Sequence, residues 1–318
     1  MIDGRPVMLL DSASLYFRAF YGVPDRRDDP GQEPNNAARG FLDMIATLVS
    51  AHRPGGLVAC WDDDWRPAFR VEAIPSYKTH RLAEESAQAE EVPDALAPQV
   101  PVIVDALRAL GITRVGAPGF EADDVIGTLT TRMVAVGRPV DVVTGDRDLF
   151  QLVDDAAGVR VLYTARGGVR DPDVVDEAFL RATYDVTGGD RYADLAVLRG
   201  DPSDGLPGVR GIGPKSAAIL LSRYGDLAGL RAALADGDPG IKGAPRTRLL
   251  EAAEYLDAAP RVVRVVRDID LGDVDVALPE QVSDPTAMSR LAVDYRLTGP
   301  FTRVVSALGL GQRGQGSA

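Results

Sequence analysis

The sequence predicts an α/β protein with a mostly parallel sheet flanked by helices, followed by a helical second domain. Short apolar runs alternate with helical patterns up to about Asp190, and strand signals nearly vanish after it. The chain has 318 residues, of which 45% are hydrophobic, and this length exceeds what one core usually serves. We therefore expect one large domain and one smaller domain.

Four apolar runs predict the strands, and they are Val7 to Leu10, Leu57 to Trp61, Val140 to Thr144 and Val159 to Tyr163. Apolar residues recur at helical spacing within residues 41–49, 100–110 and 125–133, between the strands. Further helices are predicted around residues 193–198, 215–224, 227–235 and 246–256. The order of these elements implies a sheet with helices on both faces.

Three segments lack apolar periodicity. Residues 25–34 are polar and rich in Pro and Gly, and residues 83–93 carry the acids Glu84, Glu85, Glu90 and Glu91. We interpret these glutamates as a solvated charge run. Residues 309–318 are of low complexity, and we expect a disordered tail there.

The composition excludes two classes of protein. No apolar run approaches the roughly 18 residues of a membrane span, and the first residues do not resemble a secretory signal, so we expect a cytoplasmic protein without a membrane partner. The single cysteine, Cys60, permits no internal disulfide and lies in a predicted strand. The thiol is therefore expected to be buried.

Aspartates follow three of the predicted strands. Asp11 comes directly after the first strand and Asp62 after the second, while Asp146 and Asp148 follow the third. Because ligands of parallel sheets bind beyond the carboxyl ends of the strands, these side chains should meet at one edge.

A predicted helix start contributes further acids. Glu121, Asp123 and Asp124 fall in the first turn of this helix, where the helix dipole favours negative charge. Clustered carboxylates repel one another and cannot all stay ionised without a counter-charge. Because only Arg147 is interleaved with them and no Cys or His set lies nearby, Mg²⁺ or Mn²⁺ is the expected compensation. Thiolate zinc is excluded.

A glycine-rich segment follows two more acids. Asp201 and Asp204 precede residues 206–215, where several glycines permit a tight turn and Pro214 suits the start of a helix. Backbone amides at such a helix start can hold a phosphate. A glycine-rich hairpin alone does not identify a nucleic-acid partner.

In combination, these motifs resemble the bacterial 5′→3′ exonucleases, which include the N-terminal nuclease domain of DNA polymerase I, and the related flap endonucleases. The resemblance extends from about Val7 to Leu308, and the chain looks like a stand-alone member. It rests on Leu10-Asp11, Trp61-Asp62, Gly119 to Asp124, Thr144 to Leu149, Gly200 to Asp204 and Gly208 to Gly213.

The resemblance implies a PIN-like nuclease domain over residues 1–187 with a helical arch at about residues 68–100. It implies a duplex-binding domain over residues 188–308 that contains a helix-three-turn-helix motif, which is helix-hairpin-helix-like. The implied activity is that of a structure-specific 5′-nuclease, a 5′→3′ exonuclease and 5′-flap endonuclease with a two-metal mechanism. The expected substrate is DNA with 5′ flaps, nicks or 5′ ends in replication and repair, and we expect a monomer.

The resemblance also implies roles for individual residues. The metal ligands would be Asp11, Asp62, Glu121, Asp123, Asp124, Asp146, Asp148, Asp201 and Asp204, for two or possibly three ions of Mg²⁺ or Mn²⁺. Arg18, Lys78 and Arg81 would be catalytic. DNA would be bound by Arg70, Tyr77, Arg210, Gly211, Gly213, Lys215 and Ser216. A potassium ion, K⁺, would be held by backbone carbonyls of Gly208, Val209 and Ile212. Gly205 departs from the family pattern, where asparagine is common, and Asp63 and Asp64 are surplus acids.

The net charge of −12 argues against a nucleic-acid partner, because phosphate binding needs basic surface. Metal ions would offset the clustered acids, and two of the three lysines, Lys78 and Lys215, fall in the arch and hairpin motifs. Two alternatives stay open, a PIN-type single-strand ribonuclease and a catalytically silent protein that binds branched DNA.

Overall fold

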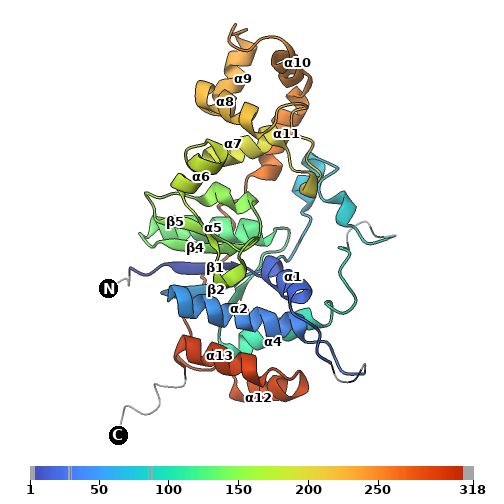
Figure 1. Cartoon of the computed structure of the whole chain (residues 1–318), viewed down its shortest axis with the longest axis vertical. Coiled ribbons are helices and arrows are strands. Elements are labelled where there is room, and N and C mark those ends of the chain that lie inside the picture. Colours follow the sequence, from blue (N-terminus) through green and yellow to red (C-terminus); the bar gives the residue numbers. More distant parts are fainter. Residues whose placement is uncertain (1–3, 28, 30, 85, 87–88, 311–318) are drawn as a thin grey trace.

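A six-stranded sheet in the order β3-β2-β1-β4-β5-β6 lies at the centre of the computed structural model, which describes all residues except 1–3, 28, 30, 85, 87–88 and 311–318 (Figure 1). The strands are β1 (Val7–Asp11), β2 (Gly56–Cys60), β3 (Thr113–Val115), β4 (Val140–Thr144), β5 (Val159–Tyr163) and β6 (Asp173–Val175). All neighbours are parallel except β6, which is antiparallel to β5.

Thirteen helices are found within the described residues. They are α1 (Ser12–Gly22), α2 (Asn36–His52), α3 (Ala68–Ala73), α4 (Gln99–Leu110), α5 (Ala122–Ala135), α6 (Glu177–Tyr184), α7 (Gly189–Arg199), α8 (Pro214–Tyr224), α9 (Leu227–Ala235), α10 (Ala244–Glu251), α11 (Ala253–Val263), α12 (Pro285–Asp294) and α13 (Thr298–Leu308). Short 3-10 turns lie at Thr79–Arg81, Asp148–Leu152, Gly168–Arg170 and Pro202–Asp204. No helix in the described part of the chain is long and apolar enough to cross a membrane.

Two hydrophobic cores sandwich the sheet. Along β1, Val7 and Leu9 belong to one core while Met8 and Leu10 belong to the other, as the alternation of side chains along a strand requires. The first core continues into α5 and the helices α7 to α11, and the second contains α2 and α4. Cys60 is buried in the first core, as expected.

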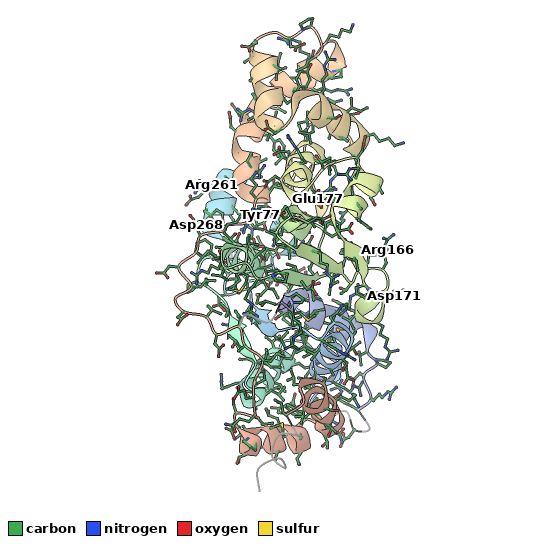
Figure 2. All side chains as sticks on the ribbon, turned by 90° about the vertical axis from the view of Figure 1, so that its left-hand side faces the viewer. Tyr77, Arg166, Asp171, Glu177, Arg261 and Asp268 are labelled. Carbon is green, nitrogen blue, oxygen red and sulfur yellow. The ribbon has the colours of Figure 1, made fainter. Side chains whose placement is uncertain are left out.

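The predicted end of the helical domain at residue 308 is wrong. Helices α7 to α11 form the region above the sheet in Figure 1, but α12 and α13 lie at the opposite end of the molecule. There α13 packs on α2 and α12 packs on α4, with Phe301 and Val304 buried in the second core. Figure 2, turned by 90°, shows the same order of layers. The chain therefore returns to the nuclease domain after α11, because the apolar faces of α12 and α13 complete that core.

The expected helical arch is not a long helix in this structure. Among the described residues of 68–98, the helical elements are the six-residue α3 and the 3-10 turn at Thr79–Arg81. The rest is turn and extended chain, with an isolated bridge between Leu82 and Glu90. Pro67 and Pro75 flank α3. Because proline disfavours the helical conformation of the residue before it, these prolines limit the length of α3. The expected tail lies mostly outside the described residues.

The register of the sheet brings the ends of three strands into line. Asp11 pairs with Cys60 of β2, and Leu10 pairs with Val143 of β4. The residues that follow β1, β2 and β4 therefore begin at the same edge of the sheet, as the sequence predicted.

Candidate active site

The strand ends place aspartates at one edge of the sheet. Asp11 caps α1 by accepting a hydrogen bond from the Ser14 amide at 3.1 Å, and it accepts another from Thr144 Oγ1 at 2.7 Å. Asp62 accepts from the Ala122 amide at 2.7 Å, which joins the end of β2 to the start of α5. These contacts orient both carboxylates across the gap between β1, β2 and α5.

The first turn of α5 supplies the next acids. Glu121 occupies the N-cap position, and its side chain and that of Asp124 form a capping box. Asp123, between them, is half-buried and faces the gap. A cavity of about 240 Å³ opens here, and its acidic lining consists of Asp11, Asp62, Glu90, Glu121, Asp123 and Asp146.

The proximity of these acids shifts their pKa values. Burial, together with the charge of Asp62, raises the pKa of Asp11 to about 7. Burial and the charge of Glu121 raise the pKa of Asp62 to about 6. The pKa of Asp123 is also raised, by burial and by Asp11 and Asp146. The cavity therefore holds more negative charge than its surroundings compensate.

A second group of acids lies beside the first. Burial and the charges of Asp146 and Asp204 raise the pKa of Asp148, and burial also raises the pKa of Asp204. Asp201 is buried, and its charge is offset by ion pairs to Arg147 and Arg199 at 3.4 Å each. Asp146 and Asp148 are held in one turn, because the Asp148 amide donates to Asp146 Oδ1 at 3.0 Å.

The donor set fits a hard divalent cation, since it consists of carboxylate oxygens without Cys or His. Within the described part of the chain, however, no three of these side chains converge closely enough to form a ready-made metal site. The acids come from separate elements and face a shared space. Their mutual repulsion is what a bound cation would relieve.

Cations of residues 70–81 occupy part of the acid edge. Lys78 is buried and forms an ion pair with Glu121 Oε2, and Arg81 contacts Asp204 Oδ1 at 2.9 Å. Burial would raise the pKa of Glu121, but Lys78 and Arg70 beside it hold that pKa below its usual range. Lys78 and Arg81 therefore both contact acids of this edge.

Three predictions for this region need correction. Arg70 and Tyr77, predicted to bind DNA, are buried at 2% and 3% exposure, and both donate to Glu121. They therefore cannot face a DNA strand in this structure. Asp124, predicted as a metal ligand, is fully buried and engaged by Arg70 at 2.7 Å through both oxygens. Its charge is compensated without a metal ion.

Gly205, which departs from the family pattern, lets the segment around Ser76 approach the acids. Its φ is +73°, and a Cβ at this position would collide with the Ser76 carbonyl oxygen. Ser76 Oγ donates to the Gly205 carbonyl at 2.8 Å, and the Lys78 amide donates to the Asp204 carbonyl at 3.0 Å. Glycine is therefore the residue that this close backbone contact requires.

Sequence reasoning missed Glu90 and left Asp63 and Asp64 unexplained. Glu90, assigned to a solvated charge run, is half-buried and lines the cavity, and burial raises its pKa. The bridge to Leu82 places it there, and no local sequence signal reveals that contact. Asp63 forms an ion pair with Arg114, and Asp64 accepts from the Arg66 amide at 3.1 Å. Both surplus acids therefore have structural partners.

Comparisons with known proteins agree with this architecture. The family model of the 5'-3' exonuclease N-terminal resolvase-like domain matches residues 6–185, and that of the 5'-3' exonuclease C-terminal SAM fold matches residues 187–284. The chain belongs to the 5′-3′ exonuclease family. It is therefore a hydrolase that acts on DNA as a 5′-3′ exonuclease.

Two relatives align with this chain over almost all of their own length, and a polymerase aligns over a smaller part of its length. A 5'-3' exonuclease of Streptomyces coelicolor is 59% identical, over 95% of this chain and 99% of that protein. A 5'-3' exonuclease of Mycobacterium tuberculosis is 47% identical, over 95% and 98%. The DNA polymerase I of the same species is 42% identical, over 67% of this chain and 22% of the polymerase.

The fold of the exonuclease also matches solved structures. The bacteriophage T5 D15 flap endonuclease is 18% identical with a TM-score of 0.62, over 97% of this chain and 100% of that chain. The catalytic core of Rad2 is 19% identical with a TM-score of 0.58, over 96% and 92%. These likenesses concern the fold.

The glycine hairpin of the exonuclease projects from the helical region. Gly211, Gly213, Lys215 and Ser216 are exposed, as is Arg210, whereas Gly208, Val209 and Ile212 are buried. At Gly208 and Gly200 a Cβ would collide with the facing backbone, so the two glycines permit the close approach that shapes the hairpin. The Val209 carbonyl accepts from the Ile212 amide at 2.9 Å.

Arg18 lies on α1 near the acid edge and is half-buried. No hydrogen bond or ion pair joins it to another of the described residues, so its charge is available to an anion. Phe17, next to it, lines the cavity.

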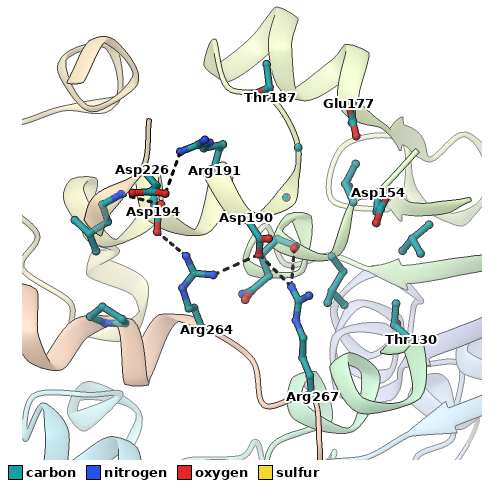
Figure 3. A pocket seen from close by; sticks show the side chains of 18 of the residues that line it. Thr130, Asp154, Glu177, Thr187, Asp190, Arg191, Asp194, Asp226, Arg264 and Arg267 are labelled. Carbon is teal, nitrogen blue, oxygen red and sulfur yellow. Dashed lines mark hydrogen bonds and ion pairs between the residues drawn. The ribbon is translucent and has the colours of Figure 1, made fainter. Parts of the chain in front are cut away.

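A second, larger groove of about 870 Å³ lies between α7, α9 and the segment after α11, and Figure 3 shows it closely. Arg264 donates to Asp194 at 2.6 Å and pairs with Asp190 at 3.4 Å, while Arg267 pairs with Asp190 at 3.6 Å. The groove shares no lining residue with the acidic cavity. The ion pairs of the groove join α7 to the segment that follows α11. Because its acidic and basic side chains pair with one another, the groove has no clear surplus of negative or positive charge.

Proposed function

We propose that the exonuclease hydrolyses DNA phosphodiesters with two divalent cations, Mg²⁺ or Mn²⁺, held by its two groups of carboxylates. Asp11, Asp62, Glu121 and Asp123 would hold one cation. Asp123, Asp146, Asp148 and Asp204 would hold the other. The observation that carries this proposal is the set of carboxylates that lines one cavity, which includes Asp11, Asp62, Glu121, Asp123 and Asp146. Beside it, burial and the charge of Asp146 raise the pKa of Asp148 and of Asp204.

The bound cations would supply Lewis-acid activation of water and stabilisation of the leaving 3′ oxygen. Two structures of the bacteriophage T5 D15 protein contain metal ions, which supports a metal requirement. Asp201 is proposed to act at the margin of the site, because two arginines already offset its charge.

Three cations of the chain are proposed to act on the scissile phosphate. Lys78 and Arg81 stand on the acid edge, and Arg18 has no partner in the described structure. A cation placed before the reaction stabilises charge that develops on non-bridging oxygens. For Lys78 this requires exchange of its Glu121 partner for the phosphate.

The proposed substrate is DNA with a 5′ flap, nick or 5′ end, recognised by shape rather than sequence. Arg210, Lys215 and Ser216 lie exposed at the hairpin and the start of α8, where backbone amides favour phosphate. A K⁺ ion held by the carbonyls of Gly208, Val209 and Ile212 is part of this proposal. We further propose a cytoplasmic monomer that serves DNA replication and repair.

The test is a cleavage assay on a 5′-labelled flap, a nicked duplex and a flap of the same sequence in RNA. We expect cleavage of the DNA flap with Mg²⁺ or Mn²⁺, none in EDTA, and products with a 5′-phosphate and a 3′-hydroxyl. Preferential cleavage of the RNA would favour the PIN-type ribonuclease. Tight binding of the flap without cleavage in either metal would favour a silent binding protein.

A further inference from the structure

We propose that Arg70 is a positioning residue that fixes one oxygen of Glu121 and leaves the other for a cation. Asp124 then holds the Arg70 guanidinium in place and does not bind a metal ion. This inference rests on the proposed two-metal function. Arg70 is 2% exposed, and its guanidinium donates to acceptors of three residues. Its Nη1 donates to Glu121 Oε1 at 3.1 Å, its two terminal nitrogens donate to Asp124 at 2.7 Å, and its Nε donates to the Val262 carbonyl at 3.0 Å.

Asp124 has no acceptor capacity left. An ionised carboxylate offers about four lone-pair positions. Asp124 Oδ1 accepts from Arg70 Nη2 and, at 2.8 Å, from the Val266 amide. Asp124 Oδ2 accepts from Arg70 Nη1 and, at 3.2 Å, from the Glu121 amide. All four positions are filled, so a metal ion at Asp124 would have to displace a buried hydrogen bond.

The two oxygens of Glu121 have different surroundings. Oε1 accepts from Arg70 and, at 2.7 Å, from the Tyr77 hydroxyl, which together fill its lone pairs. Oε2 contacts Lys78, which like Glu121 lines the acidic cavity. Because Lys78 is the cation proposed to move to the phosphate, Oε2 is the oxygen that becomes available. Glu121 therefore offers a cation one oxygen in a fixed direction.

The network also ties this geometry to the helical region. Val262 lies in the last turn of α11, and Val266 follows where the chain returns to the nuclease domain. Arg70 donates to the Val262 carbonyl and Asp124 accepts from the Val266 amide, so the position of Glu121 depends on how α11 packs against α3. Arg70 transmits that packing to the metal pocket without touching DNA.

The first experiment separates positioning from DNA binding in the full chain. In Arg70→Lys we expect flap affinity in EDTA within twofold of wild type and a single-turnover rate at saturating enzyme lowered about tenfold or more. Arg70→Gln should be slower still, so that lysine partly rescues the rate. Exposed Arg210→Ala is the matched control, which should lose affinity instead. Loss of affinity at normal rate in Arg70→Lys would overturn the proposal.

The second experiment measures metal binding without DNA, by calorimetric titration with Mn²⁺. Asp124→Asn should keep the number of Mn²⁺ sites and bind within about threefold of wild type, whereas Glu121→Gln should bind at least tenfold more weakly. Loss of a Mn²⁺ site in folded Asp124→Asn would make Asp124 a ligand and sink the inference.

If Asp124→Asn does not fold, the double variant that combines Arg70→Gln with Asp124→Asn removes both charges. An unchanged number of Mn²⁺ sites is again expected. If wild type cleaves no DNA, the proposed function fails, while the Mn²⁺ titrations still decide the role of Asp124.

Discussion

Asp123 is the acid that both proposed metal groups share. It lies in the first turn of α5, it lines the cavity, and the charges of Asp11 and Asp146 both act on it. Loss of a residue in the outer shell of a metal site typically costs about 10–100-fold in activity. Loss of a direct ligand that both cations share should therefore lower activity more than loss of any single residue around the site.

We predict that Asp123→Asn lowers single-turnover cleavage of a 5′ flap by more than about 10²-fold. Affinity for the flap should stay within a few-fold, because binding rests on basic groups elsewhere. Exposed Asp273→Asn is the control and should cleave normally. Near-normal cleavage by Asp123→Asn at saturating Mg²⁺ would contradict the two-metal assignment.

The acids also predict how stability depends on pH. In the folded metal-free protein, the pKa of Asp11 is about 7 and that of Asp62 about 6, above the ordinary value near 3.8. The folded state therefore binds these protons more tightly than the unfolded state. Stability must therefore fall as pH rises from about 4 to about 7, the window between the unfolded and folded pKa values.

We expect the melting temperature in EDTA to decrease over this window and the slope to flatten in Asp11→Asn but not in Asp273→Asn. Saturating Mn²⁺ should remove much of the slope, because the cation replaces the protons. The ion pairs of Glu121 lose their contribution to stability only as pH falls from the ordinary value of 4.5 through its lowered pKa, so they do not affect the slope above pH 4.5. A melting temperature that rises with pH in EDTA would contradict the assignment.

At the scale of elements, the segment of residues 68–81 and the start of α8 present their lysines differently. Lys78 is buried against Glu121 at the catalytic edge, whereas Lys215 is exposed beyond the hairpin. A cation at the reacting phosphate stabilises the transition state, and a cation at a remote phosphate stabilises only the complex.

Lys78→Ala should lower the single-turnover rate at saturating enzyme by about 10²-fold. Lys215→Ala should leave that rate nearly unchanged but weaken binding and reduce the salt slope by about one phosphate contact. Stopped-flow cleavage and binding at several salt concentrations measure both. If both variants lost only affinity, Lys78 would not be catalytic.

Gly205 offers a second test at this scale, because it joins the turn that carries Asp204 to the segment around Ser76. Gly205→Ala should destabilise the protein by about 1–3 kcal/mol, from an unfavourable positive φ and a collision with the Ser76 carbonyl. Gly237→Ala has a similar φ of +76° but open space around it, so it isolates the steric part. Equal losses in urea unfolding would show that the contact with Ser76 is unimportant.

Elements with a strong local signal were predictable. β4, β5 and α9 have the predicted bounds, and the strand-end aspartates meet because register follows from the parallel sheet. β3 and β6 have three residues each, too few to show a period. The predicted helix 246–256 is two helices, α10 and α11, which divide at Ala252 without a glycine or proline to mark the break.

The meeting of the strand-end aspartates was predictable, but the burial of Arg70 and Tyr77 was not. The position of an aspartate that follows a strand can be inferred from the topology of the sheet. Arg70, in contrast, finds its partners on α5 and α11, up to 192 residues away in the sequence. Nothing local distinguishes an arginine that binds phosphate from one that fills a buried carboxylate. Burial of Arg70 and Tyr77 is therefore a property of the tertiary fold alone.

For the whole molecule, the return of the chain below the sheet is the main structural consequence that local patterns do not give. In the sequence, the helical region is inserted between two parts of the nuclease domain, because α12 and α13 pack on α4 and α2. The C-terminal helices therefore belong to the stability of the catalytic domain. They are not part of the surface proposed to bind duplex.

Phe301, 3% exposed in α13, tests this arrangement, because its ring fills the core beside α2. Phe301→Ala should lower the free energy of unfolding by about 3–5 kcal/mol through loss of buried area and a residual cavity. Val293→Ala on α12, whose side chain is 77% exposed, should change it by less than about 0.5 kcal/mol. If instead α13 belonged to a separate duplex-binding domain, Phe301→Ala would weaken flap binding and leave the unfolding of the nuclease domain unchanged. Urea unfolding monitored by Trp fluorescence decides between them, because Trp61 and Trp65 lie in the nuclease domain, and Trp61 shares the core with Phe301.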